Sequence, residues 1–333
     1  MLLSVVIVAK NEEKNIARCI ESVLAHTAGL GPVEVVLADS ASTDNTVTIG
    51  SRYPINIISL HPQWPLSPSA GRFSGVNNTS GEYVLIIDGD MELLPGWMEK
   101  AIDFLVKHPR VVGVVGRHVD IAVSPDGIGH VVNPRKPGEI GRAYKTDHVY
   151  CSSVFRRKEL LEAGNFQPFL RAEEEAECSC RLILNGGELW HLPDDSVKHY
   201  AIPRRTLQES FRRFNRGFLH GIGDMFTWCF WKGYYPVLWQ KCRVYFILIA
   251  SIFCSIVGFT MMHGALGGIG FLLAGAPAWF WVLMMLKKKS ITDGTLSMVN
   301  ITAISYSIML ALFRRVPEIN TYPTDVIWVK KVV

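Results

Sequence analysis

Acidic side chains stand close together at two places in the sequence. The first is Asp88-Gly89-Asp90, which directly follows the apolar run Tyr83–Ile87. Two carboxylates one residue apart at the end of a strand can share a divalent cation that also binds a diphosphate. The alternative interpretation is a tight turn, in which Asp-Gly is common. The position directly after an apolar run favours the cation site.

The second acidic cluster is the segment Glu173-Glu174-Glu175-Ala176-Glu177. Crowded carboxylates raise one another's pKa, which suits a general base near neutral pH. The acidic first turn of a helix explains the same residues, because the positive end of the helix dipole favours negative charge. For this segment by itself, the second interpretation is the stronger one.

Two further side chains are candidates by position. Asp39 ends the apolar run Val33–Ala38, where its carboxylate can accept a hydrogen bond from a nucleobase N–H or a ribose hydroxyl. The polar residues that follow it are typical of a helix N-cap, which explains Asp44 but not Asp39. His199 carries a metal-ligating side chain, although a lone histidine is more often structural.

The first half of the sequence predicts the elements that must position these residues. Apolar runs rich in β-branched residues predict strands at Leu2–Ala9, Val33–Ala38, Ile55–Leu60, Tyr83–Ile87 and Val111–Val115. Helical spacing predicts helices at Glu12–Ala25, Ser69–Thr79, Pro95–Lys107, Arg157–Ala163 and Glu173–Leu184. This alternation is typical of an α/β fold with a mainly parallel, Rossmann-like sheet. Ligands of such sheets bind beyond the carboxyl ends of the strands, where Asp39 and Asp88 fall.

Composition sets the class of protein. The chain has 333 residues, of which 49% are hydrophobic and 19% charged, so it can bury a sizeable core. Its 34 Lys and Arg nearly balance its 30 Asp and Glu, which argues against a nucleic-acid partner. The seven cysteines show no paired spacing, and the chain starts without a secretory signal, so we expect reduced thiols on the cytosolic side. Residues 124–146, rich in glycine, proline and charge, predict a loop over the sheet edge.

The hydrophobic content is concentrated in residues 244–286, which contain no Asp, Glu, Lys or Arg. A bilayer crossing needs ~20 apolar residues, so this segment predicts a transmembrane hairpin that turns at His263-Gly264. Basic residues flank both ends of this hairpin. The positive-inside rule therefore places both ends in the cytoplasm. Residues 204–243, both basic and aromatic, predict interfacial helices. We expect residues 287–333 to form a cytoplasmic tail in which 296–313 lies in the membrane plane or re-enters it, with a third crossing as the alternative.

Six segments resemble, in the right order, the motifs of family 2 glycosyltransferases with the GT-A fold. They are Ser4–Glu12, Leu37–Asp44, Ala70–Gly75, Gly81–Asp90, Phe155–Phe166 and Glu174–Leu182. Any one of these matches is weak, but six in order are specific, and together they extend from about Leu3 to Tyr200. The resemblance implies a GT-A type nucleotide-binding domain over residues 1–203.

The resemblance also implies an activity and a set of site residues. The activity is the inverting transfer of one hexose from a nucleotide-sugar, with UDP as the expected nucleotide. The implied nucleotide-binding residues are Ala9, Asn11, Glu12, Asp39, Arg72, Asp88 and Gly89. Mg²⁺ or Mn²⁺ would be held by Asp88, Asp90 and His199. Glu175 stands where the family has its catalytic Asp, and because Glu is one methylene longer, the base is either Glu175 or Glu174.

The predicted membrane segments indicate the chemical class of the acceptor. They point to a polyprenyl-linked or saccharide acceptor in surface polysaccharide or glycoconjugate assembly, and to a multi-pass protein of the cytoplasmic membrane with its catalytic domain in the cytoplasm. A processive polymerase is disfavoured, because the Q-x-x-R-W motif is absent. One alternative is a nucleotidyltransferase acting on a sugar phosphate, but Lys10–Glu13 lacks the glycine-rich loop it needs. The other is an inactive membrane-anchored nucleotide-binding protein, which the intact carboxylate pairs disfavour.

Overall fold

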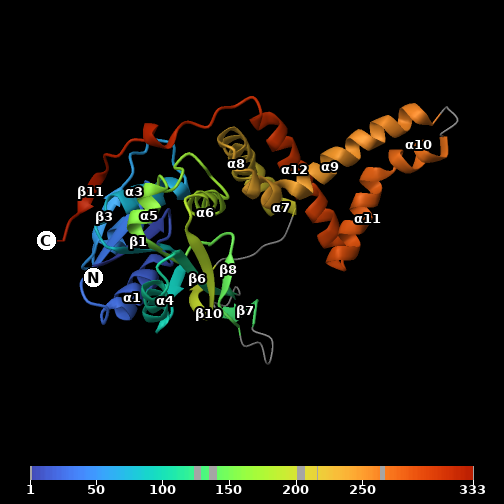
Figure 1. The fold of residues 1–333 in the computed structure, drawn as a ribbon. Coiled ribbons are helices and arrows are strands. Elements are labelled where there is room, and N and C mark those ends of the chain that lie inside the picture. Colours follow the sequence, from blue (N-terminus) through green and yellow to red (C-terminus); the bar gives the residue numbers. More distant parts are fainter. Residues whose placement is uncertain are drawn as a thin grey trace. The chain divides into compact units, whose positions relative to one another are not determined.

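The computed structural model describes residues 2–123, 129–134, 141–200, 207–215, 217–262 and 267–332. The chain divides into two compact units. The first contains Met1–Leu170, Glu174–Pro203 and Pro317–Val333, and the second contains Arg171–Glu173 and Arg204–Val316. Figure 1 shows the first unit as a sheet with helices around it and the second as helices alone.

The centre of the first unit is a parallel sheet, as the sequence predicts. Four neighbouring strands run parallel in the order β3, β2, β1, β4, with bounds β1 Leu3–Ala9, β2 Val33–Asp39, β3 Asn56–Ser59 and β4 Tyr83–Asp88. Beyond β4 the sheet becomes mixed, because β9 is antiparallel to both β4 and β6. The remaining strands are β5 Met91–Leu93, β6 Val111–Val123, β7 Gly129–Val131, β8 Tyr144–Thr146, β9 Ser153–Arg156 and β10 Glu188–His199. The α/β fold is therefore confirmed, but the sheet as a whole is mixed: antiparallel strands lie beyond β4 and also at the β3 edge.

Helices cover both faces of this sheet. Side chains alternate along β1, so Val5 and Ile7 enter one core and Val6 and Val8 the other. The first core is closed by α1 Ile16–Thr27, α2 Thr46–Gly50 and α4 Trp97–Lys107. The second is closed by α3 Pro68–Asn77, α5 Arg157–Glu162 and α6 Glu174–Leu184. Burial on both faces explains why β1 is a continuous apolar run.

Helix α1 begins at Ile16, four residues later than the predicted Glu12. The intervening residues form a turn in which Asn11 has a φ of +58°. The Glu12 backbone N–H donates to the hydroxyl of Thr46, and that of Glu13 donates to the carboxylate of Asp44. The turn is thereby fixed to the segment that follows β2.

The end of the chain returns to the first unit. Strand β11, Ile327–Lys330, pairs antiparallel with β3 at the edge of the sheet, after a short 3₁₀ helix at Ile319–Thr321. The ring of Tyr322 is buried edge-on against Trp64, Phe73 and Phe169. The sequence grouped residues 287–333 as one tail, whereas the structure divides them at Pro317. A four-residue strand is too short a pattern for the sequence to reveal its partner.

The described part of the second unit contains six helices. They are α7 Leu207–Asn215, α8 Phe218–Lys232, α9 Tyr235–Met261, α10 Gly267–Ala274, α11 Ala276–Lys288 and α12 Ile291–Ala311. By length and composition α9 and α12 can each cross a membrane, and α10 with α11 forms a third candidate that bends by 53°. The predicted interfacial segment 204–243 contains α7, α8 and the start of α9, and the predicted segment 296–313 lies almost wholly in α12. The predicted turn at His263-Gly264 lies outside the described residues.

Helices α9 and α10 approach closely through glycines. A Cβ on Gly258 would lie 2.6 Å from the carbonyl oxygen of Gly270. Only residues without a side chain permit this contact, which is the packing mode of small residues between membrane helices. Within the predicted hairpin segment, α9 and α10 are therefore closely packed.

Candidate active site

The carboxyl ends of three neighbouring strands bring the predicted residues to one edge of the sheet. Strand β1 lies between β2 and β4, with Ala9 opposite Asp39 and Val8 opposite Asp88. The sequence placed each carboxylate at the end of its own strand, and the observed register makes the two strand ends close neighbours. A ligand at this edge meets both carboxylates and the Asn11-Glu12 turn.

The Asn11-Glu12 turn and the segment after β2 are tied together. The Asn11 backbone N–H donates to Ser42 Oγ at 2.9 Å, and the Thr43 backbone N–H donates to Asn11 Oδ1 at 2.8 Å. Asn11 adopts its left-handed backbone conformation at this point, which asparagine tolerates better than most residues. The structure thus assigns Asn11 a role in shaping the edge.

Asp39 is almost completely buried, with 1% of its surface exposed. Its Oδ2 accepts hydrogen bonds from the Ser42 backbone N–H and from Ser59 Oγ, both at 3.0 Å. Its Oδ1 is buried and has no hydrogen-bond partner among the described residues. An unpaired buried acceptor is costly, so this oxygen suits a ligand that donates an N–H or O–H.

A cavity of about 290 Å³ opens beside these residues. Ala9, Glu12, Asp88, Gly89 and Asp90 are among the residues that line it. A Cβ on Gly89 would lie 3.1 Å from that of Ala9, so a side chain at this position would crowd the wall of the cavity. Burial raises the pKa of Glu12, and the nearby negative charges of Asp90 and Asp88 add to this rise. The cavity is therefore an acidic cleft that would favour a cation.

Arg72 extends from α3 into the cluster of carboxylates, with only 3% of its side chain exposed. Its Nη1 donates to Glu174 Oε1 at 2.7 Å. Its Nη2 lies 3.0 Å from Asp88 Oδ1 and 3.0 Å from Glu175 Oε1. The resemblance assigned Arg72 to the nucleotide, but here its guanidinium is bonded to three protein carboxylates. One charge therefore links the end of β4 to the start of α6.

The two candidate bases differ in their surroundings. Glu174 is buried, whereas 22% of the Glu175 side chain is exposed. Burial raises the pKa of Glu174 to about 8, the neighbouring charge of Glu175 adds to the rise, and Arg72 opposes it. A single guanidinium cannot neutralise three carboxylates, so the most deeply buried of them holds a proton most readily.

His199, at the end of β10, lies between two acids. Its Nε2 is 3.4 Å from Asp90 Oδ2, and its Nδ1 is 3.2 Å from Asp120 Oδ1. Hydrogen bonding to Asp90, together with Asp120, raises the pKa of His199 to about 9 despite its partial burial. Asp120 is itself fixed by Asn133 Nδ2, which donates to Asp120 Oδ2 at 2.9 Å.

The donor atoms present at this edge suit a hard cation that shares a diphosphate. Within the described ranges, no group of three or more His, Cys, Asp or Glu side chains is arranged to hold a metal ion. However, Asp90 Oδ1 is buried without a hydrogen-bond partner among the described residues. Mg²⁺ commonly uses one or two carboxylates and takes its other ligands from water and substrate phosphates. The carboxylate of Asp90 fits that pattern, while the carboxylate of Asp88 is paired with Arg72.

The sequence analysis did not identify three polar residues in the neighbourhood of His199. Asp120 is one of them, and His118 and Ser152 are two more, joined by a 2.7 Å contact between His118 Nε2 and Ser152 Oγ. Burial lowers the pKa of His118 to about 4, so this imidazole is neutral. Asp120 and His118 belong to the extension of β6 beyond the predicted Val111–Val115. The alternation of apolar and polar residues in that extension was the available signal.

Residues 4–163 match the family model described as Glycosyl transferase family 2. The amylovoran biosynthesis glycosyltransferase AmsE of Erwinia amylovora is 27% identical over 207 residues, which cover 59% of this chain and 75% of AmsE. For several other curated glycosyltransferases, the match spans only about two fifths of their length.

Solved structures share the fold. S. aureus TarS 1-349 in complex with UDP-GlcNAc superposes with a TM-score of 0.53 at 16% identity, covering 95% of this chain and 93% of TarS 1-349. GalNAc-T7 with UDP, GalNAc and Mn²⁺ gives a TM-score of 0.50 at 19% identity, covering 60% of this chain and 43% of that one. At these identities the likeness concerns the fold alone.

We expect Glu174→Gln to remove part of the pH dependence of stability. The pKa of Glu174 in the folded chain, about 8, lies above the ordinary value of 4.5. Its protonation therefore stabilises the fold fully below pH 4.5, and this contribution is lost as the pH rises through about 8. The melting temperature of the full chain in detergent should fall between about pH 5 and about pH 9 by less in Glu174→Gln than in wild type.

Glu162→Gln is the matched control, since its side chain is 62% exposed on α5. It should keep the wild-type pH dependence. An identical dependence in wild type and Glu174→Gln would contradict the assignment of a proton to Glu174.

Proposed function

Because residues 4–163 belong to glycosyl transferase family 2, we propose that the chain transfers one sugar from a nucleotide-sugar to an acceptor, with inversion at the anomeric carbon. The observation that carries this proposal is the gathering of Asp39, Asp88, Asp90 and Glu175 at one sheet edge. These side chains supply what the reaction needs: a nucleotide contact, charge for a diphosphate site, and a base.

The donor is proposed to be UDP-linked. The unpaired Oδ1 of Asp39 suits the N–H of a pyrimidine base, and Ala9 and Glu12 line the cleft alongside. The complex of TarS with UDP-GlcNAc supports this choice, because that protein shares the fold. Gly89 permits close approach of the donor to the backbone.

Asp90 and His199 are the residues that would hold Mg²⁺ or Mn²⁺, with Asp88 beside them. When bound, the metal would neutralise charge on the departing diphosphate. The Mn²⁺ in GalNAc-T7 supports the choice of cation. Asp120 would orient His199 by its contact with Nδ1, as carboxylates commonly do for metal-ligating histidines.

Glu175 is the proposed base. An acceptor hydroxyl attacks the anomeric carbon from the face opposite the diphosphate, and Glu175 takes the proton of that hydroxyl. The bond from the anomeric carbon to the diphosphate oxygen breaks, and the nucleoside diphosphate leaves. Glu175 is preferred to Glu174 because its side chain is partly exposed, whereas that of Glu174 is buried against Arg72.

The function is tested by incubating the full-length protein with a panel of nucleotide-sugars and Mn²⁺ and measuring release of the nucleoside diphosphate. Glu175→Gln should reduce turnover by ~10²–10⁴-fold, the range for a lost general base, with little change in donor affinity. The surface variant Glu162→Gln should retain wild-type turnover. A larger loss in Glu174→Gln than in Glu175→Gln would move the base to Glu174, and release of no nucleoside diphosphate from any donor would overturn the proposed function.

The acceptor is proposed to be lipid-linked, in the assembly of surface polysaccharide or glycoconjugate at the cytoplasmic membrane. The apolar helices of the second unit support a membrane location. The similarity to AmsE, a protein of amylovoran biosynthesis, supports a role in polysaccharide assembly.

The return of the chain to the first unit restricts the membrane topology. Residues 317–332 are folded with residues 2–170: β11 pairs with β3, Tyr322 Oη donates to Pro65 O at 2.9 Å, and Gln167 Nε2 donates to Pro317 O at 3.1 Å. Both ends of the segment 204–316 therefore lie on the same side of the membrane. This segment must cross the bilayer an even number of times, so three crossings are excluded in this proposal.

Two crossings fit best as α9 and the pair α10–α11. The uncharged part of α9, residues 244–261, is about 27 Å long, close to the ~30 Å hydrocarbon core. Lys287 and Lys288 lie in the last turn of α11, Lys289 follows it, and the three favour a cytoplasmic end. In an apolar 18-residue stretch of each helix, 44% of the residues of α12 are buried against 11% of those of α9. We therefore take α12 as the segment that stays on the cytoplasmic side of the bilayer.

Single cysteines in a background without the native seven test this topology. An impermeant thiol reagent added outside intact cells should label Met262→Cys, after α9, but neither Lys288→Cys nor Asp325→Cys. Asp325 is the reference for the catalytic side, since its exposed side chain belongs to the first unit. Labelling of position 288 from outside, with 325 protected, would assign the second crossing to α12 and contradict a crossing by α10–α11.

A further inference from the structure

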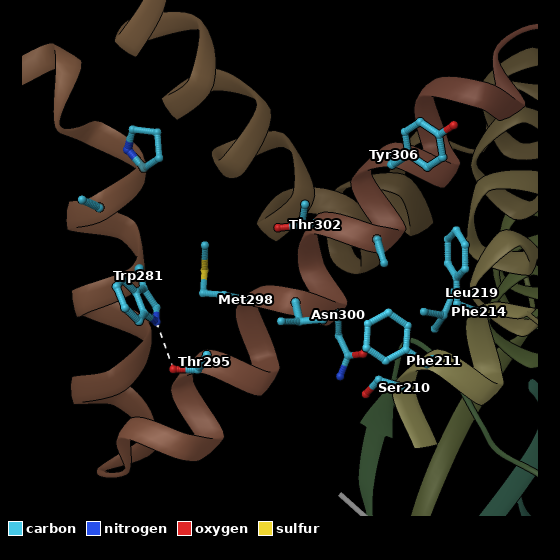
Figure 2. A pocket seen from close by; sticks show the side chains of 14 residues that line it. Ser210, Phe211, Phe214, Leu219, Trp281, Thr295, Met298, Asn300, Thr302 and Tyr306 are labelled. Carbon is cyan, nitrogen blue, oxygen red and sulfur yellow. Dashed lines mark hydrogen bonds between the residues drawn. The ribbon is translucent and has the colours of Figure 1, made fainter. Parts of the chain in front are cut away.

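Helix α12 forms one wall of an apolar cavity of about 760 Å³ in the second unit, together with α7 and α11 (Figure 2). None of the described residues that line this cavity is charged, so its lining does not select one apolar ligand over another. Beyond α12 the chain returns to the first unit, where we call residues 317–326 the C-terminal segment. This segment makes directed contacts, and they fall on the loop between β3 and α3.

The β3–α3 loop, residues 60–67, forms part of the wall of the acidic cleft at the sheet edge. Its residues Leu66 and Ser67 line the same cavity of about 290 Å³ as Asp88 and Asp90. The loop contains no helix or strand. Its conformation therefore depends on contacts with other parts of the chain.

Tyr322 of the C-terminal segment holds this loop by two kinds of contact. Its hydroxyl donates to the carbonyl oxygen of Pro65 at 2.9 Å. Its ring lies edge-on to Trp64 of the loop, Phe73 of α3 and Phe169, at centroid distances of 5.8, 5.7 and 5.3 Å. Only 2% of Tyr322 is exposed, so the bond to Pro65 replaces a hydrogen bond to water.

Gln167 links the same segment to the helix that follows the loop. Its side-chain Nε2 donates to the carbonyl oxygen of Pro317 at 3.1 Å, and its backbone carbonyl oxygen accepts from Ser69 Oγ at 2.7 Å. Ser69 belongs to the first turn of α3, the helix that carries Arg72. The C-terminal segment is thus bonded to the loop directly and to the start of α3 through one buried side chain.

We propose that Tyr322 is a positioning residue for the nucleotide-sugar donor. It fixes the β3–α3 loop in the conformation that places Leu66 and Ser67 in the wall of the cleft, so the cleft is shaped before the donor binds. The proposal rests on the proposed function in one respect, namely that this cleft holds the donor. The competing interpretation is that Tyr322 only stabilises the fold of the first unit.

The two interpretations differ in what they predict for binding and for turnover. If Tyr322 positions the loop, its loss weakens donor binding, because the loop must then be ordered as the donor binds. Turnover at saturating donor should change little, since the proposed base Glu175 is held by Arg72. If Tyr322 only stabilises the fold, its loss lowers the melting temperature and leaves the affinity for the donor unchanged.

Calorimetry with UDP and Mn²⁺ on the full-length protein in detergent tests the proposal. Tyr322→Phe keeps the ring and removes one hydrogen bond, so we expect the Kd for UDP to rise by a factor of ~2–10. Nucleotide release at saturating donor should stay near the wild-type rate. Tyr53→Phe is the matched control, because Tyr53 Oη also donates one hydrogen bond, to Glu21 Oε1 at 2.7 Å, and Tyr53 does not line the cleft. It should keep the wild-type Kd.

A larger change separates positioning from stability. Tyr322→Ala should raise the Kd for UDP further than Tyr322→Phe, because the ring contacts are lost as well. Leu105→Ala removes a fully buried side chain of α4 from the core on the other face of the sheet, so it should lower the melting temperature without changing this Kd. Hydrogen exchange of residues 60–67 without nucleotide should be faster in Tyr322→Phe than in wild type and unchanged in Tyr53→Phe.

An unchanged Kd for UDP in Tyr322→Phe would overturn the proposal, as would unchanged exchange of residues 60–67. An equal rise of the Kd in Tyr322→Ala and Leu105→Ala would overturn it too, because the effect would then follow stability. Failure of the proposed transferase activity has a different result: no donor releases its nucleotide in the wild-type protein. Failure of the positioning role leaves that turnover intact.

Discussion

The candidate active site depends on one buried guanidinium. Arg72 of α3 joins β4 to the distant helix α6, because its two terminal nitrogens contact Asp88 at the end of β4 and Glu174 and Glu175 at the start of α6. A charge removed from water is tolerated only when it is paired, and here one cation contacts three carboxyl groups. The same contacts that satisfy Arg72 fix the distance between the proposed diphosphate site and the proposed base.

This arrangement also explains why the adjacent residues Glu174 and Glu175 differ in their burial and surroundings. Glu174 is buried and shares Arg72 with its neighbours, so its carboxylate is under-neutralised and its pKa is raised to about 8. Glu175 is one residue further along the helix, and its side chain is partly exposed. Position on the helix therefore decides which of the two carboxylates is exposed.

The sequence predicted the sheet and the edge at which Asp39 and Asp88 lie, because β1, β2 and β4 are continuous apolar runs that each end near a polar residue. It did not predict what Arg72 contacts, since Glu174 is 102 residues away and no local pattern reports such a pair. It also did not identify Asp120 as a partner of His199. It did not predict β11, whose four residues pair with β3, a strand near the other end of the sequence. The sequence also could not predict that Glu174 is more deeply buried than Glu175, because either residue fits the first turn of a helix.

The most direct test of the role of Arg72 is sugar-nucleotide turnover by Arg72→Lys in the full chain with Mn²⁺. Lysine keeps the charge but offers a single ammonium in place of a planar fork, so it cannot hold three carboxylates in the same geometry. We predict a loss of turnover of at least ~100-fold, the cost expected when reacting groups are displaced by about 1 Å. UDP should still raise the melting temperature of this variant, because the Asp39 contact is intact. Near-wild-type turnover, or a selective loss of UDP binding, would contradict the conclusion that Arg72 organises the site through its carboxylate partners.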